Sequence, residues 1–315
     1  MSLALVFPGQ GSQSVGMLGE LAERHPVVRR TYQEAADAVG YDLWELTANG
    51  PAERLNSTEC TQPAMLAAGV ATWHAWRECG GPVPEMVAGH SLGEFTALVC
   101  AGALEFRTAL ALVRERGRAM QAAVPAGRGA MAAILGLEDA AAEAACLEAA
   151  QGEVVEAVNY NAPGQIVIAG DARAVERAMA AAKARGAKRA LLLPVSVPAH
   201  SSLLQGAAAR FRERLAQTTI GAPVVRWFSA VDAAEHGTPE GIRAILERQL
   251  ASPVRWTPTV LALTAGGATL LVECGPGKVL TALNRRIDRR TEVNCMAIED
   301  SASLQAAVDA AGSTH

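Results

Sequence analysis

Short apolar runs alternate with longer segments of helical periodicity along this chain. Residues 3–7 form an apolar run that ends at a Pro-Gly pair, which is typical of a strand buried on both faces. A second run, at residues 86–89, leads into the Ala-rich helical pattern of residues 94–101. The same periodicity predicts helices over 20–39, 65–79 and 106–124. Strands that alternate with helices predict an α/β fold.

A separate pattern occupies residues 126–198, after the Gly-rich stretch that follows Pro125. Strands are predicted at 130–135, 154–159, 165–169 and 190–195, and helices at 138–150 and 171–185. This βαββαβ order is ferredoxin-like. After Pro198 the alternation resumes, with helices at 201–215, 241–250 and 279–290 and strands at 224–229, 270–274 and 293–297.

We therefore expect a large α/β-hydrolase-like domain with an inserted small ferredoxin-like subdomain. Residues 1–125 and 199–315 would form the large catalytic domain, and residues 126–198 the insertion. Ligand sites are common between two such bodies, so we expect the functional site at their cleft.

Composition and charge exclude several classes of protein. Half of the 315 residues are hydrophobic and 19% are charged, which excludes a largely disordered chain. The net charge of −4 gives no overall attraction to nucleic acid or to an anionic membrane. The six cysteines show neither CxxC nor a zinc-ligand spacing, and residues 1–7 lack the basic start of a signal peptide. We expect a cytoplasmic protein with no metal, whose cysteines are small core residues.

The segment Gly89-His90-Ser91-Leu92-Gly93 fits the G-x-S-x-G pattern of a nucleophile elbow. In such an elbow, a sharp turn between a strand and a helix lifts the serine hydroxyl clear of the sheet. The predicted strand before it and the helix after it supply that context. The pattern indicates Ser91 as a nucleophile, and the alternative is a tight turn with a capping serine.

A serine nucleophile needs a general base, and His200 is the best candidate among the histidines. It follows the last predicted strand of the insertion, where the chain returns to the large domain. His90 adjoins Ser91, but neighbouring side chains of an extended backbone point to opposite sides. A histidine before a helix is otherwise a cap or a packing residue, which is the alternative for His200.

Arg116 is predicted to point inward from its helix. It shares a stripe with Leu112 and Met120, whereas Arg114 and Arg118 fall on other faces. A guanidinium on an apolar face requires an anion, and its planar fork matches a carboxylate. The anion would be a substrate carboxylate or, alternatively, an internal Glu or Asp.

The loop Phe7-Pro-Gly-Gln-Gly-Ser-Gln13 follows the first predicted strand. It does not fit a nucleotide-binding loop, because Met17 stands where the P-loop lysine belongs and Ser14 where the third dinucleotide-binding glycine belongs. What remains is a turn whose backbone amides could stabilise a developing oxyanion.

Seven ordered segments together resemble the malonyl-CoA:acyl carrier protein transacylases, the acyltransferase family of fatty-acid and polyketide synthesis. The resemblance covers essentially the whole chain. The segments are Phe7–Gln13, Thr61-Gln-Pro-Ala64, Gly89–Gly93, Arg116-Gly117, Asn159-Tyr-Asn-Ala-Pro-Gly-Gln165, Val195-Ser-Val-Pro-Ala-His200 and Glu273-Cys-Gly-Pro-Gly-Lys-Val-Leu280.

The resemblance implies a role for each candidate residue. Ser91 would be the acylated nucleophile, His200 its base, and Arg116 the ligand of the free malonyl carboxylate. The backbone amides of Gln10 and Leu92 would form the oxyanion hole. Gln62 and Asn161 would lie near the substrate.

The resemblance also implies how His200 is oriented. In the family a backbone carbonyl, rather than a carboxylate, receives the histidine. Ser252 occupies the position where relatives often have Asn for this purpose. We expect the backbone contact to survive the substitution.

The implied reaction is ping-pong transfer of a malonyl group from malonyl-CoA to the phosphopantetheine thiol of holo acyl carrier protein, in fatty-acid biosynthesis. We expect no bound cofactor, no nucleic-acid or membrane partner, and a monomer. Two basic clusters are candidates for docking the carrier protein, and both have an alternative as solvated helix ends. They are Arg285, Arg286, Arg289 and Arg290, and Lys183, Arg185, Lys188 and Arg189.

Two other functions remain open from the sequence. A serine hydrolase such as a thioesterase would use the same elbow with water as the acceptor, although it would not need a buried arginine. A docking subunit without catalysis would keep the fold, although the intact Ser91 and His200 argue against it.

Overall fold

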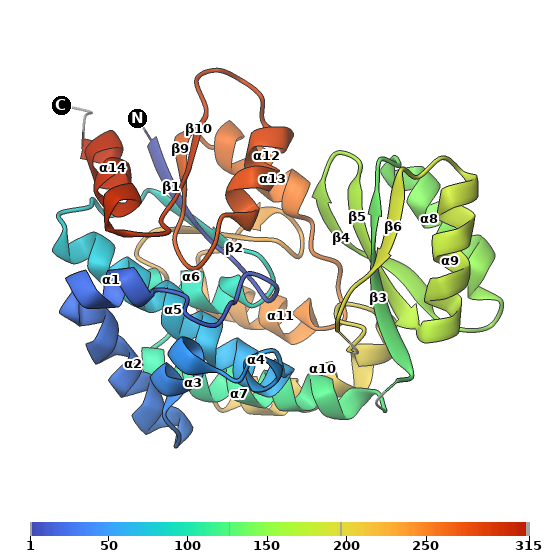
Figure 1. Ribbon diagram of the computed structural model, residues 1–315, viewed down its shortest axis with the longest axis horizontal. Coiled ribbons are helices and arrows are strands. Elements are labelled where there is room, and N and C mark those ends of the chain that lie inside the picture. Colours follow the sequence, from blue (N-terminus) through green and yellow to red (C-terminus); the bar gives the residue numbers. More distant parts are fainter. Residues whose placement is uncertain (1, 126, 196, 313–315) are drawn as a thin grey trace. The chain divides into compact units, whose positions relative to one another are not determined.

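The computed structural model describes residues 2–125, 127–195 and 197–312, which form two compact units (Figure 1). The first unit consists of Met1–Gly117, Thr218–Ile242 and Thr259–His315. The second unit consists of Arg118–Gln217 and Arg243–Pro258. The second unit therefore includes the segment with the βαββαβ pattern and adds residues that precede and follow it.

A six-stranded sheet forms the centre of the first unit, in the order β10-β9-β1-β2-β7-β8. Its strands are β1 (Ser2–Phe7), β2 (Met86–Gly89), β7 (Arg226–Ser229), β8 (Ala234–Glu235), β9 (Ala268–Glu273) and β10 (Asn294–Ala297). All neighbours pair in parallel except the short β8, which is antiparallel to β7. The carboxyl ends of β9, β1, β2 and β7 therefore meet at one edge, where ligands of such sheets bind.

Helices precede and follow these strands along the chain. They are α1 (Gly19–Arg24), α2 (Pro26–Val39), α3 (Leu43–Asn49), α4 (Ala52–Leu55), α5 (Thr58–Glu78), α6 (Gly93–Cys100), α7 (Phe106–Ala123), α11 (Pro239–Gln249), α12 (Trp256–Ala265), α13 (Val279–Ile287) and α14 (Ser301–Gly312). Helix α6 packs against β1, β2 and α5, and α5 also packs against α2. Gly69 makes the approach of α5 to α6 possible, since a Cβ atom there would lie 2.6 Å from the Thr96 methyl carbon.

The single helix predicted over residues 20–39 is wrong, because the structure has two helices there. His25 is extended between them, and Pro26 opens the second helix. A proline disfavours helical geometry in the residue before it and suits the first helical turn itself. The helix predicted over 279–290 also ends earlier, at Ile287, where Asp288 becomes extended.

The second unit contains a four-stranded antiparallel sheet in the order β4-β5-β3-β6. Its elements are β3 (Gly129–Leu135), α8 (Asp139–Ala150), β4 (Val155–Ala162), β5 (Gln165–Asp171), α9 (Ala172–Ala184) and β6 (Arg189–Leu192). Helices α8 and α9 lie side by side on one face of this sheet and form an aliphatic core with it (Figure 1). This order of strands confirms the ferredoxin-like prediction.

The remaining helical segments of the second unit follow the small sheet along the chain. The helix predicted over 201–215 begins as a 3-10 turn, η1 (Ser202–Leu204), and continues as α10 (Gln205–Ala216). The N–H of Ser202 donates to the Glu156 carboxylate of β4 at 2.7 Å. This bond ties the start of the helix to the small sheet.

The six cysteines are free thiols. Cys146, Cys274 and Cys295 are buried, as expected for small core residues. The other three are only partly buried.

Candidate active site

Ser91 lies at the sharp turn that joins β2 to α6. Its φ of 53° falls in the left-handed region, which residues other than glycine seldom adopt. Both glycines of the elbow are required by close contacts. A Cβ atom on Gly89 would lie 1.9 Å from the Gly93 carbonyl carbon, and one on Gly93 would lie 2.0 Å from the Phe7 oxygen. The predicted strand, elbow and helix are confirmed.

The loop after β1 packs directly against this elbow. The N–H of His90 donates to the Phe7 oxygen at 3.0 Å, and a Cβ atom on Gly9 would lie 2.4 Å from the His90 oxygen. Among the described residues, the backbone N–H groups of Gln10 and Leu92 donate to no protein acceptor. Two adjacent loops therefore carry amides that are available to a ligand oxygen.

Arg116 is the charged group of this site. Its side chain is 1% exposed, which confirms the prediction that it points inward from α7. Its Nη2 donates to the Ser91 Oγ at 3.2 Å, and its guanidinium carbon lies 5.8 Å from the centre of the Phe95 ring. The arginine predicted from the helix stripe and the serine predicted from the elbow thus lie in direct contact.

No internal acid forms an ion pair with Arg116 among the residues that the structure describes. Its Nε is buried and has no hydrogen-bond partner within that part of the chain. Burial lowers the pKa of Arg116 from 12.5 to about 10, against the opposing effect of the Glu94 carboxylate. The guanidinium therefore remains charged at neutral pH and has donors available for an anion.

The position of Arg116 depends on close packing between α7 and α5. A Cβ atom on Gly117 would lie 2.8 Å from the Thr58 oxygen at the start of α5. Gln62 lies one turn beyond Thr58 on the same side of α5 and is 1% exposed. Gln62 is therefore buried on the side of α5 that faces α7. The closest approach of α7 to this side is at Gly117, the residue after Arg116.

His200 belongs to the second unit and is held there by main-chain groups. Its backbone adopts a φ of 67°, and its N–H donates to the Leu250 oxygen at 3.1 Å. Its ring Nδ1 lies 3.0 Å from the Gln249 oxygen and 3.1 Å from the Ser252 oxygen. The expectation that a backbone carbonyl at Ser252 receives the histidine is confirmed.

These two carbonyl oxygens decide the protonation of the His200 ring. A carbonyl oxygen only accepts, so Nδ1 must carry the proton in order to bond to it. The neutral ring then has its lone pair on Nε2. His200 is 4% exposed, so its orientation is fixed by packing as well as by these bonds.

Asn161 lies in the same unit, at the irregular end of β4, and is 9% exposed. The segment that carries Ser252 is tied to this strand by two backbone bonds. The Val254 N–H donates to the Val158 oxygen at 2.8 Å, and the Tyr160 N–H donates to the Val254 oxygen at 2.9 Å. Asn161 and the residues that hold His200 are thus supported by the same strand.

Glu94 is a site residue that the sequence analysis did not identify. It is fully buried in the first turn of α6, and its Oε1 accepts from the Ser229 Oγ at 2.8 Å and the Ala230 N–H at 2.6 Å. A signal was present in the sequence, because Glu94 directly follows the elbow and begins an otherwise apolar helix.

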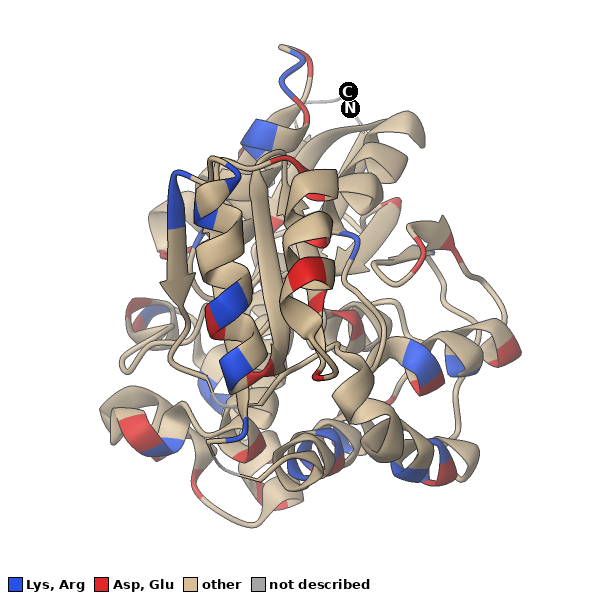
Figure 2. Cartoon of the chain, turned by 90° about the vertical axis from the view of Figure 1, so that its right-hand side faces the viewer, with Lys and Arg blue, Asp and Glu red and all other residues tan. Residues whose placement is uncertain are grey.

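Each of the two predicted basic clusters has members that bond within the protein. Arg285 donates to the Cys295 oxygen at 2.8 Å, and Arg290 forms an ion pair with Asp288 at 2.6 Å. In the other cluster, Arg185 forms an ion pair with Glu148 at 2.5 Å. The basic residues of both clusters are exposed. Most charged residues of α9 and the start of β6 are basic, whereas those of α8 are all acidic (Figure 2).

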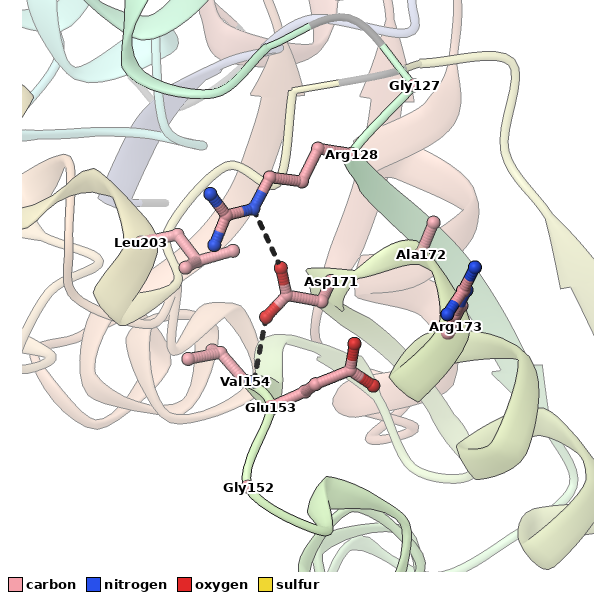
Figure 3. A pocket seen from close by; sticks show the side chains of 9 residues that line it. All are labelled: Gly127, Arg128, Gly152, Glu153, Val154, Asp171, Ala172, Arg173 and Leu203. Carbon is pink, nitrogen blue, oxygen red and sulfur yellow. Dashed lines mark hydrogen bonds and ion pairs between the residues drawn. The ribbon is translucent and has the colours of Figure 1, made fainter.

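A pocket of about 400 Å³ in the second unit contains none of the predicted site residues (Figure 3). The Asp171 carboxylate in it accepts from the Arg128 Nε at 3.2 Å and from the Val154 N–H at 2.9 Å. These bonds join the ends of β5, β3 and β4. The polar groups of this pocket therefore have a structural role.

The residues that the structure describes contain no group of three or more His, Cys, Asp or Glu side chains arranged to hold a metal ion. Within the same residues, every helix is too short or too polar to span a bilayer.

Comparison with known proteins places this site in a family. A model of the acyl transferase domain matches residues 4–300. The malonyl CoA-acyl carrier protein transacylase of Salmonella typhimurium is 53% identical over 305 residues, which cover 97% of this chain and 98% of that protein. The enzyme of the same name from Bacillus subtilis strain 168 is 42% identical and covers 97% and 96% of the two chains.

Solved structures agree with these relatives. An acyl carrier protein S-malonyltransferase from Vibrio cholerae has a TM-score of 0.94 at 53% identity, covering 97% of this chain and 99% of that one. A malonyl-transacylase in complex with a holo type II PKS acyl-carrier protein has a TM-score of 0.96 at 51% identity, covering 98% and 100%. The chain therefore belongs to the acyl transferase domain family, among the malonyl CoA-acyl carrier protein transacylases.

Proposed function

We propose that this protein transfers a malonyl group from malonyl-CoA to the phosphopantetheine thiol of holo acyl carrier protein in fatty-acid biosynthesis. One observation carries the proposal. The fully buried guanidinium of Arg116 lies 3.2 Å from the Ser91 hydroxyl oxygen and has no internal acid as a partner among the described residues. A nucleophile beside a buried cation suits an acyl group that carries a carboxylate at its far end.

In the first half-reaction, the Ser91 Oγ attacks the thioester carbonyl carbon of malonyl-CoA. His200 accepts the hydroxyl proton at Nε2, and the amides of Gln10 and Leu92 stabilise the tetrahedral oxyanion. The C–S bond then breaks, and the proton passes from His200 to the sulfur of CoA. The product is a malonyl-serine ester. The protonated Nδ1 of His200, held by two carbonyl oxygens, supports this assignment of the base.

In the second half-reaction, the carrier-protein thiol takes the place of the serine hydroxyl. His200 accepts the thiol proton while the sulfur attacks the malonyl-serine carbonyl. The bond to Ser91 Oγ breaks and the proton returns to that oxygen. The same oxyanion hole serves both halves because the two tetrahedral intermediates carry the charge on the same carbonyl oxygen.

Arg116 selects malonyl over acetyl groups in this proposal. An acetyl group would leave the buried guanidinium without its anion, whereas the malonyl carboxylate would accept from it twice. Gln62 and Asn161 are proposed to contact the substrate. Both are polar side chains that are at least nine-tenths buried, which supports a ligand-facing role.

Holo acyl carrier protein is the proposed partner, and the exposed cluster of Lys183, Lys188 and Arg189 is its proposed docking surface. Exposed Leu191 and Leu192 continue this surface along β6. A surface that is both basic and apolar suits an acidic partner with an apolar helix face. The solved complex of a related transacylase with an acyl-carrier protein supports a partner of this kind.

We propose that the protein works as a cytoplasmic monomer without a bound cofactor, and that residues 126–198 form an inserted subdomain. The free thiols are consistent with a reducing compartment.

Intact-mass measurement after incubation with malonyl-CoA tests the proposed reaction. A malonyl adduct should form on the wild-type protein, map to Ser91, and disappear when holo acyl carrier protein is added, with malonyl carrier protein as the product. The Ser91→Ala variant should fold and form no adduct. An adduct that persists in this variant, or equal release of free malonate with and without the carrier, would refute the proposal.

A further inference from the structure

The loop after β1 carries the Gln10 amide, and close packing holds the backbone only on one side of that residue. Gly9 is buried, and a Cβ atom on it would lie 2.4 Å from the His90 oxygen. Gly11 is exposed, and a Cβ atom on it would meet nothing within 4 Å in the described part of the chain. Packing therefore fixes the backbone before Gln10 and leaves Gly11 to other contacts.

The direction of the Gln10 N–H depends on both of its neighbours. The N–H groups of Gln10 and Gly11 belong to consecutive planar peptide groups, which are joined only at the Gln10 Cα. Gly11 has a φ of 106°, and glycine has more backbone freedom than any other residue. The Gln10 amide therefore keeps one direction only if a further bond fixes the peptide group of Gly11.

The Gln13 side chain supplies that bond. It folds back along the loop, and its Oε1 accepts from the Gly11 N–H at 2.7 Å. A backbone N–H only donates, so the amide oxygen of Gln13 must face Gly11 and its Nε2 must point away. This Nε2 donates to the Asn56 Oδ1 at 2.9 Å. One side chain thus links the loop to a residue 43 positions away.

Asn56 is a firm attachment point for this link. It directly follows α4, and its own N–H donates to the Ala52 oxygen at 2.8 Å. Leu55, the residue before it, is 1% exposed, and the Leu55 oxygen accepts from the Thr61 Oγ1 of α5 at 2.6 Å. The main chain at Asn56 is therefore held by two helices, and Gln13 transmits this support to the loop.

We propose that Gln13 and Asn56 are positioning residues that hold the Gln10 N–H in the direction needed to stabilise the oxyanion. The proposal rests on the malonyl-transfer function proposed above, in which this amide is one of two oxyanion donors. Such a donor acts at hydrogen-bond distance from the developing charge, so a small displacement lowers the rate of the chemical step. Binding of malonyl-CoA does not depend on that donor and should stay the same.

Single-turnover kinetics test this role. Intact mass after rapid quenching measures the rate of malonyl-enzyme formation at several malonyl-CoA concentrations. In Gln13→Ala the rate constant at saturation should fall about tenfold or more, with an unchanged half-saturating concentration. The final amount of adduct should still reach the wild-type level. A merely structural loss would lower the fraction of chains that react and leave the rate constant of the others unchanged.

Variants of Asn56 test the second bond. Asn56→Ala should slow the same step, whereas Asn56→Asp should keep the wild-type rate because its carboxylate accepts from the Gln13 Nε2. The double variant Gln13→Ala with Asn56→Ala should be no slower than Gln13→Ala alone, because the two side chains act as one unit. Gln33→Ala is the matched control. It removes an exposed glutamine whose Nε2 donates to the Asp37 Oδ1 at 3.2 Å on α2, and its rate should be unchanged.

The two proposals fail differently. A wild-type protein that forms no malonyl adduct would refute the proposed function. A wild-type protein that forms the adduct, with an unchanged rate constant in Gln13→Ala, would refute the positioning role alone. An equal fall in Gln33→Ala, or a fall in Asn56→Asp as large as in Asn56→Ala, would likewise overturn it. If Gln13→Ala does not fold, the comparison of the two Asn56 variants decides.

Discussion

At the scale of single residues, Arg116 is a charged side chain whose burial the helix pattern predicts. It is among the largest fully buried side chains of the protein, although arginine is normally exposed. The stripe that it shares with Leu112 and Met120 predicts that its side chain points inward. No local pattern predicts which residue the guanidinium contacts there. The contact with Ser91 depends on packing between elements that are distant in sequence.

Replacement of Arg116 by alanine should reduce malonyl transfer far more than acetyl transfer. Malonyl-CoA should lose about 100-fold or more in kcat/KM, because the carboxylate would be buried without its cation. Acetyl-CoA has no charge at that position and should change much less. Parallel kinetics with the two substrates measure this difference, and equal losses on both would make Arg116 a structural residue.

Glu273 leads to a prediction for the pH dependence of stability. Its fully buried carboxylate accepts from the Leu280 and Thr281 N–H groups, yet desolvation dominates and raises its pKa from 4.5 to about 7. The folded state thus binds a proton that the unfolded state releases between these two values. Stability from this group is fully present below about pH 4.5 and falls as the pH rises to about 7.

The size of this effect follows from the two pKa values. A change from 4.5 to about 7 corresponds to about 3 kcal/mol of unfolding free energy. Denaturant unfolding of the wild type and Glu273→Gln at several pH values should show a difference that shrinks or reverses across this range, since glutamine does not titrate. A constant difference between the two proteins would contradict the prediction.

At the scale of elements, glycines decide how closely helices and loops approach. Gly117 allows α7 to contact the first residue of α5, and Gly9 allows the loop after β1 to contact the elbow. These glycines have a packing role that periodicity does not reveal. The break at Pro26 is a different case, because its cause is local and could be recognised from the sequence.

The Gly117→Ala variant should destabilise the protein by about 1–3 kcal/mol and lower malonyl transfer, because its methyl group would meet the Thr58 oxygen at 2.8 Å. Gly206→Ala in α10 is the matched control. A Cβ atom there meets nothing within 4 Å, so stability should be unchanged or slightly increased. Denaturant unfolding measures both, and similar effects of the two changes would argue against a packing role for Gly117.

At the scale of the whole molecule, a net charge of −4 does not prevent a local basic surface. In the second unit, Lys183 on α9, Lys188 in the loop that follows and Arg189 at the start of β6 are exposed. Two members of the other predicted cluster, Arg285 and Arg290, already bond within the protein. Arg185 of the cluster in the second unit does so as well. We prefer that cluster for docking an acidic carrier protein because exposed Leu191 and Leu192 continue its surface.

Reversal of charge at Lys188 and Arg189, both to Glu, should raise the KM for acyl carrier protein about tenfold or more at low salt. The salt dependence of the carrier-dependent rate should also decrease. Formation of the malonyl-enzyme from malonyl-CoA should remain at the wild-type rate. Arg286→Glu with Arg289→Glu is the comparison, and an equal effect there with none at Lys188 and Arg189 would move the docking surface to α13.

Local signals in the sequence determined most of the secondary structure and the position of the nucleophile elbow. Apolar runs and helical periodicity located most strands and helices and the ferredoxin-like order, and the glycines around Ser91 located the elbow. These features depend on neighbours within a few residues, so their patterns are visible along the chain. The family resemblance added the roles that no single pattern carries.

Only the tertiary structure decided which groups meet. The carbonyls that hold the His200 ring come from residues about 50 positions away, and Ser229 and Ala230 are more than 130 positions from the Glu94 that they bond. Such contacts arise when separate elements pack together, and each participant has an ordinary local sequence. A buried polar group needs a hydrogen-bond partner, because an unpaired one is costly away from water. The fold supplies that partner from a distant part of the chain, and the local sequence does not specify it.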